Sequence, residues 1–419
     1  MTRPAEFIAR YREHMTAYLS AISGSLGRLV FSLAYFLVLA NTLPLADFGV
    51  FATASAAGVM ISRLLAFGFV SPLYRVATVK PQLVGTYTAG FLALALVSVP
   101  LIGVATLAAH AMFFARDMAL PVFVLVIAAE TLLWRPAEVV VIVNNGMNRF
   151  GRGAALTILG TAMRAAAALA LAAMPAPGLD SWAWLYLGAN ALSLIVGVML
   201  WYPRQRLRFR AALYLRRWRD SLFVALSEMV FYVQMELDKL LVLSLGGATL
   251  AGIYAIVMRL IDLTAIPIRT FSMMLVQRIM RTPELIASMR RRIQIEAGIM
   301  AVSTAGLLAL AAILFLFPNA LGRSVAPAAG IVGLALLVPG FRNLVEYQAE
   351  LLYARGQTGL RALILAGLAV LKGALLSLLL AQPWPAETLV AWLNLLFAGL
   401  YIASTLGVHP ALRRNSRAL

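Results

Sequence analysis

The chain alternates between long apolar runs and short polar linkers. Twelve of the runs are long enough to cross a bilayer, which needs roughly 20 apolar residues in a helix. Their approximate limits are 22–41, 48–71, 84–108, 119–144, 154–174, 182–202, 221–244, 250–275, 293–317, 326–353, 359–380 and 386–408. Because the runs are continuous rather than alternating, they argue against a membrane β-barrel. The pattern therefore predicts an all-α integral membrane protein with twelve transmembrane helices.

Composition supports this class. Hydrophobic residues make up 62% of the 419 residues and charged residues only 12%, whereas ordinary soluble domains carry about 25% charged residues. Residues 1–20 are too charged for a cleavable signal peptide, and no small-residue cleavage site follows them. Their apolar positions recur at helical spacing, which predicts an amphipathic lead-in helix on the membrane surface.

The linkers differ sharply in charge between the two sides of the membrane. One side carries 24 basic residues and the other only Arg116 and Arg323. By the positive-inside rule, we expect the basic side and both termini to be cytoplasmic. This asymmetry also accounts for much of the net charge of +18, as topology and contact with anionic lipids, so no nucleic-acid partner is required.

The longest basic linker, at 204–219, divides the chain into two sets of six spans. We expect an N-terminal six-helix lobe at 21–203 and a C-terminal six-helix lobe at 220–419. GVFA at 49–52 matches GIYA at 252–255 at an offset of 203, and NGMNRFGRGAAL from 145 resembles YARGQTGLRALI from 353 at an offset of 208. Two matches at nearly equal offsets predict an internal duplication with both halves in the same orientation.

Charged residues inside the predicted spans are the candidates for function. One Arg or Asp at a helix centre costs about 2.5–3.5 kcal/mol on insertion scales, so such groups line a wet cavity or pair within the bundle. The bases are Arg28, Arg63, Arg135, Arg164, Lys239, Arg259, Arg269, Arg342 and Lys372, and the acids are Glu130, Glu138, Glu228, Glu236, Asp238, Asp262, Glu346 and Glu350.

Some of these charges have local partners at helical spacing. We expect internal pairs from four combinations, any of which could instead be functional: Arg135–Glu138, Glu236–Lys239, Arg259–Asp262 and Arg342–Glu346. By contrast, Arg28, Arg63 and Arg164 have no acid within four residues. Since an unpaired buried charge is very costly, an acid on another helix or an anionic ligand must meet each of them. The planar fork of arginine suits phosphate oxygens, which favours a phosphorylated substrate.

Glu346 and Glu350 lie four residues apart on one helical face. Like charges at this spacing favour protonation of one carboxyl, as proton coupling requires. The alternative, in which each acid pairs across helices, is equally compatible with the sequence. Candidates for cavity pairing or ion coupling are Asp262, Glu346, Glu350, Arg342 and Glu130. The chain has no cysteine, and its three histidines form no ligand-spaced cluster, so we expect no metal site.

The segment LDKLLVLSLGGATLAGIYAIVMRLIDL from 237 to 263 resembles the multidrug/oligosaccharidyl-lipid/polysaccharide (MOP) exporter superfamily, and most closely its polysaccharide branch, the Wzx-type flippases. The matching positions are Asp238, Lys239, Gly246, Gly247, Gly252, Tyr254 and Ala255. A weaker copy, LPLADFGVFATA, stands at 43–54. The resemblance implies two six-helix lobes around a V-shaped cavity and transport by alternating access.

The resemblance also implies a substrate and its binding residues. It implies that an undecaprenyl-diphosphate-linked oligosaccharide crosses the bacterial inner membrane during O-antigen or exopolysaccharide synthesis, with glycosyltransferases and a polymerase as partners. Arg28, Arg63 and Arg259 match the positions at which related flippases bind the diphosphate, and Arg164 joins them as a candidate. Leu29 and Val30 follow Arg28 where peptidoglycan-precursor flippases usually carry an acid, which argues against that precursor as the substrate.

Two alternatives compete with a flippase. A cation-coupled multidrug exporter of the same superfamily should have an acidic cavity, whereas the intramembrane charges here are balanced in sign. An oligosaccharide polymerase or ligase usually needs a large outer loop, and linkers such as 175–181 and 381–385 are short. No nucleotide-binding Gly-rich Lys-Ser/Thr motif is visible. We therefore expect no cofactor, and a proton or sodium gradient as the energy source.

Overall fold

The computed structural model describes residues 27–281 and 288–415. All regular structure in this part of the chain is helical, and it contains no strand. The lead-in helix expected at 1–20 lies outside the described residues.

The N-terminal lobe contains the helices up to residue 201. It begins with the helix Gly27–Thr42. The remaining elements are α2 (Leu45–Ile61), η1 (Ser62–Gly68), α3 (Val70–Val79), η2 (Pro81–Leu83), α4 (Val84–Ala109), η3 (His110–Phe114), α5 (Leu120–Ala128), η4 (Ala129–Trp134), α6 (Arg135–Gly146), α7 (Phe150–Ala172) and α8 (Leu179–Trp201).

The C-terminal lobe is built on one long helix and the elements that follow it. These are α9 (Ala211–Arg281), α10 (Met289–Leu316), α11 (Ala326–Gly330), η6 (Val332–Ala335), α12 (Val338–Ala354), α13 (Thr358–Leu380) and α14 (Ala386–Asn415). Gly247, with φ 82°, reverses the chain inside α9 and divides it into a first limb at 211–246 and a second limb at 248–281. A residue without Cβ is needed there because this backbone region is strained for other residues.

The twelve predicted spans each correspond to a helical segment. Eight helices in the described part are long and apolar enough to cross a membrane, and one of them, Ser221–Ala265, contains the Gly247 reversal and hence two spans. The shorter helix Gly27–Thr42 matches the first prediction. The more polar segments 120–146 and 326–354 match the fourth and tenth.

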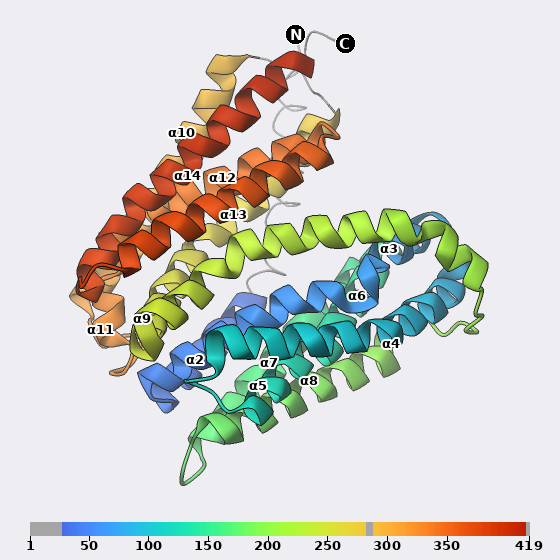
Figure 1. The fold of residues 1–419 in the computed structure, drawn as a ribbon, viewed down its shortest axis with the longest axis horizontal. Helices are drawn as coiled ribbons and strands as arrows, with labels where there is room; N and C mark the ends of the chain where they lie inside the picture. Colours follow the sequence, from blue (N-terminus) through green and yellow to red (C-terminus); the bar gives the residue numbers. More distant parts are fainter. Residues whose placement is uncertain (1–26, 282–287, 416–419) are drawn as a thin grey trace, which may run out of the picture.

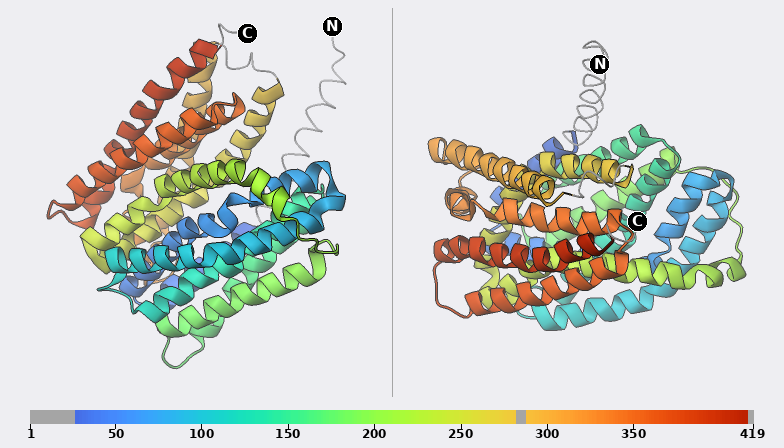
Figure 2. Two further views of the ribbon diagram at one scale, coloured as in Figure 1. Left: turned by 45° about the vertical axis from the view of Figure 1, so that its right-hand side comes forward. Right: turned by 90° about the horizontal axis from the view of Figure 1, so that it is seen from above.

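The two lobes form a V (Figure 1). They meet where α2 packs along α9, and they diverge towards the ends of the helices that carry the linkers near residues 80, 150, 205, 290 and 357. A view turned by 45° shows the same separation (Figure 2, left). We call this diverging side the basic end, because it holds the arginine-rich linkers. The all-α fold with two six-helix lobes is thus confirmed.

Gly49 and Gly252, the paired glycines of the two sequence repeats, meet where the lobes touch. A Cβ on Gly49 would lie 2.3 Å from the Gly252 nitrogen and 2.5 Å from the Ala248 oxygen, and a Cβ on Gly252 would lie 2.2 Å from the Leu45 oxygen. Each glycine therefore faces the carbonyl four residues before the other. This reciprocal contact relates the two lobes by an approximate two-fold axis and closes the molecule opposite the basic end.

A second break lies in the N-terminal lobe, inside η1, which follows α2. Ala66 and Phe67 have φ values of 54° and 49°, and Gly68 follows at 72°. Left-handed backbone at non-glycine residues costs energy and persists only where the surroundings enforce it. A Cβ on Gly68 would lie 2.4 Å from the Ser221 oxygen of α9, so the break brings this turn against the first limb.

Candidate functional site

Arg28 and Arg259 converge from opposite lobes. Arg259, on the second limb of α9, donates a hydrogen bond to the Oγ of Ser32, one turn after Arg28 on the first helix. Arg28 itself is exposed and makes no ion pair or hydrogen bond within the described part of the chain. It lines a cavity of about 210 Å³ together with Trp134 and Glu138. The two guanidinium groups therefore form the centre of the candidate site.

More positive charge surrounds this point. The side chains of Arg259, Arg269 and Arg164 are near enough to act electrostatically on Arg28, as is the carboxylate of Glu138. A cation held among three others inside a membrane protein is unfavourable unless an anion joins them. The arrangement can bind a group with two or more negative oxygens, since guanidinium forks match phosphate geometry.

Arg63 lies elsewhere, in a network of charges between the lobes. Its Nη1 is 3.2 Å from the Glu138 Oε2 and 3.9 Å from the Glu228 Oε2, and its guanidinium lies 4.0 Å from the ring centre of Tyr232. Arg135 joins the same two acids at 2.7 and 2.9 Å. Acids on other helices thus satisfy Arg63, and the expected local pair Arg135–Glu138 is confirmed as part of this network.

Arg164 and Glu130 belong to the interior of the N-terminal lobe. The Nε and Nη2 of Arg164 donate to the Asn190 Oδ1 at 3.1 and 2.8 Å, and its guanidinium stacks 4.0 Å from the ring centre of Trp134. Glu130 is buried and accepts a hydrogen bond from the Ser55 Oγ at 2.6 Å. Both side chains are engaged within one lobe, where they hold its helices together.

Two of the expected local pairs are wrong. Asp262 pairs with Arg269 at 3.1 Å and with Arg342 of α12 at 3.2 Å, not with Arg259. Glu346 pairs with Arg269 at 3.3 Å, not with Arg342. Contacts between α9 and α12 bring Asp262 to Arg342 and Glu346 to Arg269, while Asp262 and Arg269 also pair along α9 at a spacing of seven residues. Arg259 is thereby left without a carboxylate.

The two neighbouring acids of α12 have separate partners. Glu350 accepts a hydrogen bond from the Arg361 Nη2 at 2.7 Å, while Glu346 faces Arg269. Each acid thus pairs with a residue of another helix, which is one of the two alternatives that the sequence left open. Lys239 pairs with Glu236, as its spacing predicts.

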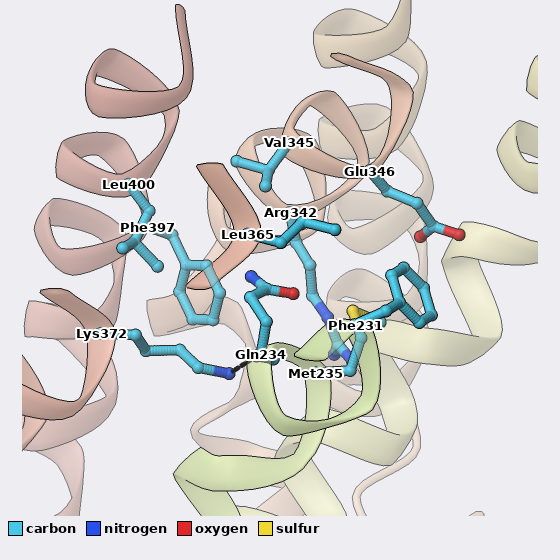
Figure 3. A pocket seen from close by; sticks show the side chains of 10 residues that line it. All are labelled: Phe231, Gln234, Met235, Arg342, Val345, Glu346, Leu365, Lys372, Phe397 and Leu400. Atoms are coloured by element: carbon cyan, nitrogen blue, oxygen red, sulfur yellow. Dashed lines mark hydrogen bonds between the residues drawn. The ribbon is translucent and has the colours of Figure 1, made fainter. Parts of the chain in front are cut away.

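The structure also contains a buried charge cluster that the sequence did not reveal. Lys372 of α13 and Asp238 of α9 are each 2% exposed and lie 3.2 Å apart, and the Tyr254 hydroxyl donates to Asp238 at 2.5 Å. Lys372 and Arg342 border a small pocket on either side of Gln234 (Figure 3). The partners are 134 residues apart in sequence, so helical spacing gives no signal for this pair.

Comparisons with known proteins identify the family of the chain. The family model described as "Polysaccharide biosynthesis protein" matches residues 38–283, more than half of the chain. The chain belongs to this polysaccharide biosynthesis family. No curated protein matches the sequence significantly.

Similar solved structures identify the fold of this chain. An inward-facing multidrug resistance MATE transporter of the MOP superfamily matches with a TM-score of 0.71 at 13% identity, over 93% of this chain and 96% of that one. A MOP superfamily transporter from Pyrococcus furiosus matches at 0.60 and 13%, over 94% and 93%. A MATE protein in complex with MaL6 matches at 0.59 and 14%, over 94% of both chains. This member of the polysaccharide biosynthesis family therefore has the same fold as these solved MOP superfamily transporters.

Proposed function

We propose that this protein is a membrane transporter that moves an undecaprenyl-diphosphate-linked oligosaccharide from the cytoplasmic to the periplasmic leaflet of the bacterial inner membrane, for O-antigen or exopolysaccharide synthesis. The observation that carries the proposal is the convergence of Arg28 and Arg259 between the lobes, with no carboxylate paired to either within the described residues. A diphosphate supplies the missing negative charge, and the family description supplies the glycan context.

The V shape of the molecule corresponds to one conformation of the proposed transport cycle. The lobes diverge at the basic end, which the positive-inside rule assigns to the cytoplasm. In this assignment the protein faces inward and accepts substrate made by cytoplasmic glycosyltransferases, and a periplasmic polymerase receives the product. A reporter fused after residue 210 will read cytoplasmic, and a periplasmic signal would overturn the orientation.

The roles of the predicted residues follow from their partners. Arg28 and Arg259 bind the diphosphate, with Arg269 contributing to the field around them. Arg63 and Arg164 position helices, because each is already engaged with protein groups. The proton or sodium gradient remains the proposed energy source, with Glu346 and Glu350 as coupling groups that would have to leave Arg269 and Arg361 during the cycle.

Export of glycan by two alanine variants tests the function. Arg28→Ala and Arg259→Ala should each reduce surface glycan at least tenfold in a strain that depends on this protein, while the variant still accumulates in the membrane. Arg323→Ala is the matched control, since Arg323 is exposed in a linker at the opposite end. Normal export by both the Arg28→Ala and the Arg259→Ala variant would refute the anion site.

Multidrug export is the second candidate, because similar solved structures include multidrug MATE proteins. A cationic drug would meet Arg28 and Arg259 unfavourably, and in the described structure no free carboxylate faces them to compensate. Ethidium efflux by the purified protein in liposomes separates the two functions. We expect none; efflux that persists in Arg28→Ala would favour the drug exporter.

A further inference from the structure

A second, larger cavity lies between the lobes at the basic end. Its volume is about 550 Å³, within the range of about 300–1,000 Å³ typical of small-ligand sites. Both lobes contribute to it. The lining residues are Val70, Ser71 and Tyr74 of α3, Ile142 and Asn145 of α6, Phe223, Val224, Ser227 and Glu228 of α9, Tyr353 of α12, and Thr358, Arg361, Ala362 and Leu365 of α13.

The polar groups in this cavity fall into two classes. The charged ones are already neutralised by protein partners, because Glu228 pairs with Arg135 and Arg361 pairs with Glu350. The neutral ones are free. None of the side chains of Ser71, Asn145, Ser227 and Thr358 makes a hydrogen bond within residues 27–281 and 288–415. The cavity thus offers hydroxyl and amide groups without a free charge.

Aromatic side chains complete the lining. Tyr74, Tyr353 and Phe223 are 47%, 49% and 71% exposed, and they come from three different helices. Aromatic rings present flat apolar faces, and tyrosine adds a hydroxyl at one end. Unpaired donors and acceptors beside such faces suit a neutral ligand with many hydroxyl groups and C–H faces, which is the chemistry of a sugar.

This cavity adjoins the arginine site. Ile142 of α6 lines both the 550 Å³ cavity and the 210 Å³ cavity that holds Arg28. The Arg135 network also connects them, since Glu138 faces one cavity and Glu228 the other. A ligand with a charged group at Arg28 and a neutral extension towards the basic end would fill both spaces.

We propose that the cavity between Tyr74, Asn145 and Tyr353 is a carbohydrate-binding vestibule, which holds the first sugars of the substrate while the arginines hold its diphosphate. The proposal rests on the proposed function and adds a second subsite to it. Recognition in the vestibule is by hydroxyl and amide hydrogen bonds and by stacking, so it selects glycan-bearing lipid over the bare diphosphate lipid.

Binding of two lipids to the purified protein in nanodiscs tests the vestibule. One probe is undecaprenyl diphosphate, and the other is the diphosphate-linked glycolipid extracted from a host strain that lacks this protein. Tyr74→Ala, Tyr353→Ala and Asn145→Ala should each weaken glycolipid binding about tenfold or more and leave binding of undecaprenyl diphosphate within twofold. Phe150→Ala, an exposed aromatic residue outside the cavity, should change neither.

The outcomes distinguish the vestibule from the flippase function on which it rests. Wild-type protein that binds both lipids equally, with no effect of the three variants, would overturn the vestibule and leave the diphosphate site intact. An equal loss for both lipids in the three variants would also overturn it. Wild-type protein that binds neither lipid would overturn the flippase function and the vestibule together.

Discussion

The contact between Gly49 and Gly252 should control access from the side opposite the basic end. A methyl group at Gly49 would lie 2.3 Å from the Gly252 nitrogen, whereas ordinary contact begins near 3.4 Å, so Gly49→Ala requires the helices to separate by about 1 Å. Overpacking of this kind costs about 1–3 kcal/mol. This cost destabilises the conformation in which α2 and α9 are in contact.

A penalty on one conformation shifts the equilibrium towards the other. About 1–3 kcal/mol corresponds to a change of about 5- to 150-fold in the ratio of the two states. We therefore expect Gly49→Ala to populate an arrangement in which the lobes have parted at this contact, and to slow transport because the closed state is less accessible.

Distance measurements between spin labels test this prediction. The chain has no cysteine, so Arg116→Cys and Arg323→Cys place one label on each lobe at the end opposite the basic linkers. Gly49→Ala should add a longer component to the distance distribution. Gly103→Ala is the matched control, because a Cβ at Gly103 meets nothing within 4 Å. An unchanged distribution and unchanged thermal stability in Gly49→Ala would refute the reasoning.

Three further predictions concern charge and backbone. Lys372→Met should lower stability by about 3–5 kcal/mol in thermal unfolding because it leaves Asp238 charged and buried, and adding Asp238→Asn should recover a large part of that loss; equal stability of the single and double variants would contradict this. Ala66→Gly should raise the melting temperature by relieving about 1 kcal/mol of left-handed strain, and a decrease would show that the methyl contacts matter more. Glu346→Gln and Glu350→Gln should each slow uptake driven by a pH gradient in liposomes, and unchanged rates would exclude them from coupling.

Much of the fold follows from hydrophobic length alone. Twelve apolar runs, the charge asymmetry of the linkers and the repeat at 49 and 252 were sufficient to predict two six-helix lobes. The break at Ala66 and Phe67 was not predictable in the same way. Neither residue favours left-handed backbone, and the turn exists because α9 lies against Gly68.

The candidate site was harder to predict than the fold. Sequence spacing found Arg135–Glu138 but misassigned Asp262, since local spacing cannot show which residue of a facing helix lies nearer. Arg28, Arg63 and Arg164 look alike in sequence, as bases without a nearby acid. Only the tertiary arrangement separates Arg28, which is unpaired among the described residues, from Arg63, which meets two acids at once.

The crossing of α2 and α9 has the character of an isologous interface within a single chain. In a symmetric dimer, one residue contacts its counterpart and the contact is repeated with the roles exchanged. Gly49 facing the Ala248 oxygen and Gly252 facing the Leu45 oxygen repeat one contact in this way. A six-helix half that paired with its own copy would need only one such glycine. In the fused chain the two positions can change independently, so one half can acquire the Arg28 site while the other acquires the buried Lys372.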